Sequence, residues 1–173
     1  YGLALTHIRM KQFSEAEPLI SKLLLENPNQ LTFQYTNLEL AIALGNYESS
    51  ISRLQKLINR NPGNYPLMSL QAEALWLDHQ YERASSILAL LSQQRKEDPK
   101  IWYRLAEVRG LAGNISGVHT ARAEYFILVG AFGLAREQLT LALKLVKEDF
   151  KRSSIIRQRL RDVVDLEERM QKL

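Results

Sequence analysis

The sequence predicts an all-α fold of about ten antiparallel helices, stacked in pairs as a solenoid. Two observations predict it. An Asn-Pro pair at residues 27–28 recurs 34 residues later, at 61–62. Aromatic residues recur at the same interval, each followed three positions later by a small residue: Phe13 and Ala16, Tyr47 and Ser50, Tyr81 and Ala84. A fixed period of this length indicates a repeated helix–turn–helix unit.

Packing explains why these residue types recur. A small residue one turn after the aromatic allows the two helices of a hairpin to approach closely. Gly45 suits the end of a helix, where a positive φ is needed. The residue before Pro avoids the helical region, so Asn-Pro ends the second helix. One hairpin cannot bury its own apolar face, so the copies must stack on one another. The pattern resembles the tetratricopeptide repeat (TPR).

The first six helices follow from this period. Apolar residues from Leu3 to Met10 predict a helix over 1–12, and Ser14 is a candidate cap for a helix over 15–26. Helices over about 30–44 and 47–60 flank the turn at Gly45. Pro66 suits the first turn of a helix over about 65–78, and a sixth helix is predicted to start near Tyr81.

The second half departs from the strict period. Pro62 and Pro99 are 37 residues apart, so we expect the sixth helix or its exit to be longer by about one turn. Further helices are predicted over about 100–112 and 115–129. The turn Gly45-Asn46-Tyr47 recurs as Gly130-Ala131-Phe132, and Phe132 is only 17 residues after Ile115, which begins the preceding helix. This half-repeat slip makes the eighth helix a member of two hairpins. A ninth helix over 132–147 and a long closing helix over 151–172 complete the array.

Composition limits the class of protein. The chain has 173 residues, of which 46% are hydrophobic and 24% charged, which excludes disordered and collagen-like classes. No linker interrupts the array, so we expect a single domain over residues 1–173. Because Tyr1 falls within the repeat pattern, we expect this domain to come from a longer protein. The formal net charge of +4 is too small to indicate nucleic-acid binding by itself.

Catalytic and metal-binding motifs are absent from the sequence. There is no Cys, and neither His7, His79 nor His119 has a His or Cys at metal-ligand spacing. We therefore expect no catalytic residue, no metal site and no cofactor in this chain.

The first helix of each hairpin lines the concave face of a TPR array, so the repeat predicts a binding groove. Its predicted members are Tyr35, Glu39, Ile42, Ser69, Glu73, Trp76, Tyr103 and Glu107. The three glutamates are 34 residues apart, and Glu39 and Glu73 have no Lys or Arg one turn away on their own helices. Either they form a solvated face, or a neighbouring repeat or a bound segment supplies positive charge. TPR domains that bind acidic C-terminal tails have Lys and Asn here, so that specificity is not expected.

A second candidate surface is basic. Residues 144–161 carry seven basic side chains against two acidic ones. The basic residues are Lys144, Lys147, Lys151, Arg152, Arg157, Arg159 and Arg161. They form either a solvated helix face or a docking surface for an acidic partner, such as another domain of the parent protein.

Two stretches carry a more specific resemblance. Trp102-Tyr103-Arg104-Leu105-Ala106-Glu107 and Ala121-Arg122-Ala123-Glu124-Tyr125-Phe126, followed by Gly130 and Gln138-Leu139, resemble the C-terminal TPR region of the beta-barrel assembly-enhancing proteases of Gram-negative bacteria. That family is a periplasmic zinc metallopeptidase with H-E-x-x-H in an N-terminal domain. The resemblance implies a periplasmic, non-catalytic domain that contacts outer-membrane proteins, the barrel-assembly machinery and its own peptidase domain, with zinc held outside this chain. The alternative is a TPR scaffold or adaptor from an unrelated cell-envelope or secretion assembly.

Overall fold

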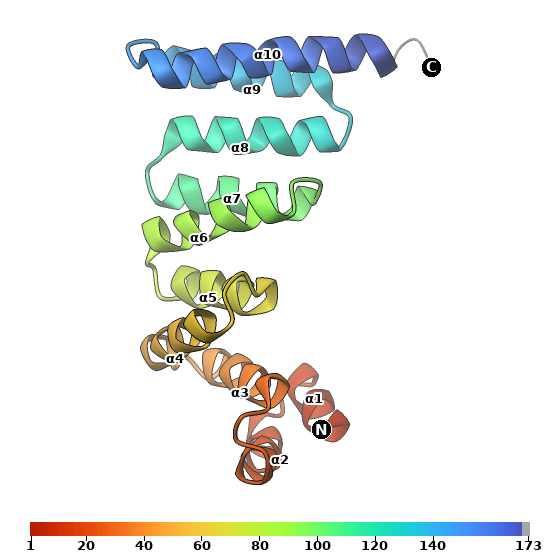
Figure 1. Cartoon of the computed structure of the whole chain (residues 1–173), viewed down its shortest axis with the longest axis vertical. Coiled ribbons are helices and arrows are strands. Elements are labelled where there is room, and N and C mark those ends of the chain that lie inside the picture. Colours follow the sequence, from red (N-terminus) through yellow and green to blue (C-terminus); the bar gives the residue numbers. More distant parts are fainter. Residues whose placement is uncertain (171–173) are drawn as a thin grey trace. The chain divides into compact units, whose positions relative to one another are not determined.

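The computed structural model describes residues 1–170, and within them the chain forms ten α-helices and no strand (Figure 1). The helices are α1 (Gly2–Arg9), α2 (Phe13–Glu26), α3 (Leu31–Ala43), α4 (Tyr47–Arg60), α5 (Tyr65–Leu77), α6 (Tyr81–Gln94), α7 (Pro99–Leu111), α8 (Ile115–Leu128), α9 (Phe132–Leu145) and α10 (Phe150–Met170). The all-α prediction is confirmed. The last two residues of the predicted closing helix, 171 and 172, lie outside the described range.

The 34-residue period is carried by the helix starts. α3, α5 and α7 begin at residues 31, 65 and 99, and α2, α4, α6 and α8 at 13, 47, 81 and 115. The predicted extra turn at α6 is therefore wrong, since α4 and α6 both have 14 residues. The longer spacing arises because the two prolines occupy different positions in their repeats. Pro62 lies in the turn after α4, whereas Pro99 is the first residue of α7, a position that tolerates the missing N–H. The expected cap at Ser14 is also wrong, because α2 begins at Phe13 and Ser14 lies inside it.

Five tight turns share one hydrogen-bond pattern. After α3, Gly45 N donates to Ile42 O (2.9 Å) and Asn46 N to Ala41 O (2.9 Å). The same pair of bonds follows α1, α5, α7 and α8. The residue that opens each turn has a positive φ: Lys11, Gly45, His79, Gly113 and Gly130. This is the Schellman geometry, which satisfies carbonyl groups at the end of a helix.

The turn after α8 confirms the half-repeat slip. The connections after α2, α4 and α6 are longer loops over residues 27–30, 61–64 and 95–98. Position 130 would belong to such a loop in a regular array, yet Gly130 has φ +76° and forms the tight turn. α8 consequently packs against both α7 and α9, and lies between them (Figure 1).

Packing contacts group the chain into two compact units, Tyr1–Gln80 and a second that begins at Tyr81. The expectation of one domain stays a prediction. The small residues that follow the aromatic positions, Ala16, Ser50 and Ala84, have no exposed surface, as close helix packing requires. In the second unit, α8, α9 and α10 share a core that includes Ala123, Leu139 and Val163. None of the helices described is both long and apolar enough to cross a bilayer.

Candidate binding surfaces

The first unit brings part of the predicted groove together on α3 and α5. Tyr35 and Glu39 lie one turn apart on α3, and Ser69, Glu73 and Trp76 lie at the same spacing on α5. We call these five residues the α3–α5 face. Tyr35, Glu39, Ser69 and Glu73 are half-buried, and Trp76 is 37% exposed. The face therefore combines two aromatic side chains with two carboxylates at the margin of solvent.

The carboxylates of this face influence each other across the two helices. Burial, and then the nearby Glu73 carboxylate, raise the pKa of Glu39 above its ordinary value, while Arg9 of α1 opposes them. Burial also raises the pKa of the Tyr35 hydroxyl, with smaller contributions from Glu39, Glu73 and Tyr1. The positive charge that the sequence did not provide on α3 or α5 thus comes in part from a neighbouring repeat. It does not fully offset the two negative charges.

Tyr1, the residue before α1, contacts α3 next to the α3–α5 face. Its hydroxyl lies 3.1 Å from Thr36 Oγ1, and its ring packs on Phe33 with centroids 5.4 Å apart. These contacts join the residue before α1 to α3, and Arg9 at the other end of α1 acts electrostatically on Glu39. The sequence prediction included no residue of α1 in the groove, because it followed only the second and later hairpins.

Ile42 does not belong to the face. It is only 4% exposed, whereas Trp76 at the equivalent repeat position is 37% exposed. α3 also buries Thr36, Leu38 and Leu40, so it is covered around much of its circumference, and an aliphatic side chain at position 42 joins the core. The prediction of Ile42 as a groove residue is therefore wrong.

The corresponding residues of the second unit lie on α7. Tyr103 is 54% exposed and Glu107 is exposed. The Tyr103 ring meets Tyr125 of α8 edge to face, with centroids 5.6 Å apart, and Tyr125 in turn meets Phe126 at 5.5 Å. The exposed Tyr103 ring therefore packs on an aromatic cluster of α8. Sequence reasoning did not include Tyr125, although its aromatic character next to Phe126 is visible in the sequence.

The predicted basic surface is smaller than expected. Six of its members are exposed on α9, α10 and the loop between them: Lys144, Lys147, Lys151, Arg152, Arg157 and Arg161. Arg159 is different and is a correction. Its Nε and Nη2 donate to the two carboxylate oxygens of Glu124 at 2.7 and 2.6 Å. This pair fixes α10 to α8, so Arg159 is not available to a partner as predicted. Arg152 also pairs locally, with Asp149 at 3.3 Å.

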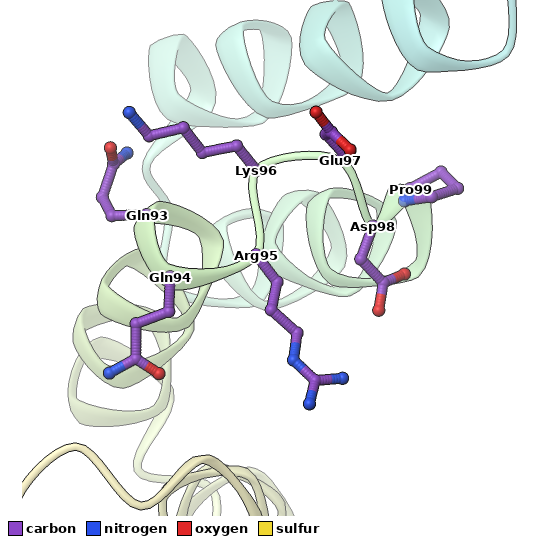
Figure 2. Close-up of a pocket in the computed structure, with 7 residues that line it drawn as sticks. All are labelled: Gln93, Gln94, Arg95, Lys96, Glu97, Asp98 and Pro99. Carbon is purple, nitrogen blue, oxygen red and sulfur yellow. The ribbon is translucent and has the colours of Figure 1, made fainter.

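The loop between α6 and α7 borders a hollow, and Figure 2 shows the side chains of residues 93–99 around it. Lys96 and Glu97 point to one side of the loop, and Arg95 and Asp98 to the other. The loop backbone is held by Trp102, whose Nε1 donates to Lys96 O at 2.8 Å. Because the charged groups diverge rather than converge, this hollow is not a built binding site.

Sequence reasoning missed a cavity in the second unit, lined by Arg109 of α7 and by the first turns of α8 and α10. Arg109 is half-buried, and its Nε has no hydrogen-bond partner. The available signal was Gly117, a glycine inside a predicted helix, which often marks a close approach of another chain segment. Within the described residues, no group of three or more His, Cys, Asp or Glu side chains is placed to hold a metal ion.

Comparisons with known proteins agree with this architecture. Residues 41–108 match the model of the family described as Tetratricopeptide repeat. The MamA RS-1 ArsTM double mutant has a similar structure, with a TM-score of 0.66 and 15% identity over 98% of this chain and 93% of that chain. A thermophilic TPR protein of Thermus thermophilus has a TM-score of 0.57 and 17% identity, over 94% and 95% of the two chains. No curated protein sequence matches this chain.

Proposed function

We propose that this TPR-fold chain is the polypeptide-recognition domain of a periplasmic zinc metalloprotease that acts on outer-membrane barrel proteins and their assembly machinery. The TPR match and the TPR-like fold support the general role of a protein-interaction scaffold. The more specific assignment rests on the sequence resemblance of the stretches at 102–107 and 121–126. Zinc belongs, in this proposal, to a peptidase domain outside the chain.

The observation that carries the proposal is the chemistry of the α3–α5 face. Trp and Tyr dominate the binding energy of many protein interfaces, and this face presents Trp76 beside Tyr35. Glu39 and Glu73 add negative charge, and Arg9 partly offsets it at Glu39. An unfolded barrel strand alternates apolar and polar residues, so its apolar side chains would meet the aromatic rings and its Lys or Arg side chains the carboxylates.

Two substitutions test the face in different ways. Trp76→Ala removes the indole and is expected to cost about 2 kcal/mol or more of binding free energy. Glu73→Lys reverses one charge and is expected to weaken binding. Because it also removes the repulsion that raises the pKa of Glu39, it should not lower the stability of the fold. Loss of binding and loss of folding are therefore separable for this variant.

The measurement is the affinity of each variant for an unfolded outer-membrane barrel segment, with helicity checked by circular dichroism. Leu90→Ala and Glu137→Lys are matched controls, because both residues are exposed on helices of the second unit. The controls should bind like the original protein. If Trp76→Ala and Glu73→Lys also do so while remaining folded, the face is only a solvated surface. If the face binds polypeptides but has no preference for barrel segments, the scaffold of an unrelated assembly becomes the better assignment.

A further inference from the structure

The cavity of the second unit has features of a ligand site. It is a hollow of about 280 Å³, partly open to solvent, between Arg109 of α7, the first turns of α8, the residue after α9 and the first turns of α10. Polar groups of Ser116 and Thr120 line it on the α8 side, and Val146 and Ile156 line it on the other. Pockets that hold drug-sized ligands have volumes of roughly 300–1,000 Å³, so this smaller cavity suits a group the size of one residue.

Arg109 is held in place by contacts that depend on Gly117. A Cβ atom on Gly117 would lie 2.8 Å from Arg109 Cδ, so only glycine leaves room for the arginine stem. The guanidinium Nη1 donates to Gly117 O at 3.0 Å and to Thr120 Oγ1 at 3.3 Å. These bonds orient the guanidinium group against the start of α8.

The guanidinium is nevertheless incompletely paired. Its Nε is buried without a hydrogen-bond partner, and no carboxylate within residues 1–170 forms an ion pair with it. Burial removes hydration from the guanidinium group and so lowers the pKa of Arg109. Arginine remains protonated in proteins, so the positive charge persists. An arriving anion would form charge-assisted hydrogen bonds and offset that loss.

The lining selects among anions. Among residues 1–170, no Asp or Glu side chain lines the cavity, and Arg152 at its edge is paired with Asp149 at 3.3 Å, so Arg109 is the cation available to an anion. The opposite wall is aliphatic, and Ile155 beside it is 62% exposed. A fully hydrated phosphate ion would not use such a wall. A carboxylate and an apolar side chain occur together on one residue at the C-terminal end of a polypeptide.

We propose that this cavity binds the C-terminal residue of a polypeptide partner, with its carboxylate at Arg109 and an aliphatic side chain against Val146 and Ile156. The site lies entirely in the second unit and is separate from the α3–α5 face. The proposal for this site can therefore be tested independently of the function proposed above.

The test uses small probes on the whole chain. N-acetyl-leucine carries the carboxylate and side chain of a terminal residue, and N-acetyl-leucinamide is the same molecule without the charge. Nuclear magnetic resonance titration, following the Arg109 Nε–H signal and the Thr120 amide, should show saturable binding of N-acetyl-leucine. The amide should bind about tenfold more weakly or worse, as expected for loss of a charged hydrogen bond. Inorganic phosphate should also bind more weakly than N-acetyl-leucine.

Two variants check the assignment to Arg109. Arg109→Met retains the stem and removes the guanidinium, and it should weaken N-acetyl-leucine binding about tenfold or more. Arg122→Met, on the exposed side of α8, should leave binding unchanged. Equal binding of acid and amide by the original protein overturns the proposal, and this comparison needs no variant to fold. Phosphate binding as tight as that of N-acetyl-leucine also overturns it, in favour of a general anion site.

Discussion

The glycine that opens the turn after α8 provides a sharp test of the slipped repeat. Gly130 has φ +76°, and its N–H donates to Ile127 O at 3.1 Å. A Cβ added at this position would meet no atom within 4 Å. Any cost of Gly130→Val therefore comes from backbone conformation and not from a clash. The left-handed conformation costs an ordinary residue roughly 1–2 kcal/mol, and a β-branched side chain is poorly suited to it. We expect a loss of about 1–3 kcal/mol in unfolding free energy.

Gly133 offers a matched control three residues later. It lies in the first turn of α9, its Cβ would also meet no atom within 4 Å, and its φ is not positive. Gly133→Val should be neutral or stabilise the chain by a few tenths of a kcal/mol, because Gly is the poorer helix former. Urea denaturation followed by far-ultraviolet circular dichroism measures both variants. Equal denaturation midpoints and slopes for the two would refute the conformational argument and the assignment of the turn.

Two further substitutions test electrostatic contacts. The raised pKa of Glu39 means that its folded state holds the proton more tightly, so stability is lost as pH rises from the ordinary value of about 4.3 through the folded value. At neutral pH, Glu39→Gln should therefore unfold at a higher urea concentration than the original protein. Below about pH 4 the two proteins should unfold at the same urea concentration, because Glu39 is then protonated. A lower urea midpoint for Glu39→Gln at neutral pH would contradict this reasoning. Glu124→Gln breaks the ion pair between Glu124, which is 22% exposed, and Arg159, which is 33% exposed. The loss of unfolding free energy should lie between the values for exposed and buried ion pairs, at about 1–2 kcal/mol. Hydrogen exchange should increase in α10, and unchanged exchange there would argue against a role in holding the helix.

Local signals predicted most of the helix boundaries. α4 begins and ends at the predicted residues because a left-handed glycine precedes it and Asn61-Pro62 follows it. Proline spacing misled the prediction at α6 because Pro is compatible with both a turn and the first position of a helix. The repeat is maintained within this chain as a spacing of helix starts rather than as a spacing of prolines. The turns are likewise kept where the residue type changes. Lys11 and His79 adopt the left-handed conformation at turn positions that glycine occupies in other repeats.

The candidate sites were predicted less completely. Repeat spacing was enough to place Glu39 near Glu73, because stacked hairpins bring equivalent positions close together. It could not show that Ile42 is covered, which depends on how neighbouring helices pack around α3. Nor could it show that Arg159 meets Glu124, 35 residues earlier in the chain. The sequence prediction did not include Arg109, because its half-buried environment depends on the close approach at Gly117 in the folded chain.

The tight turn at Gly130 also determines how the chain can be divided. Proteases cut most readily at exposed loops, and the longer connections of this chain are at residues 27–30, 61–64, 95–98 and 146–149. Between the last two of these loops lie three helices, α7, α8 and α9, joined by two tight turns. Elsewhere, two successive long loops enclose a pair. The smallest fragment that limited digestion would release from the middle of the second unit is therefore a three-helix piece, which keeps α8 with both of its neighbours.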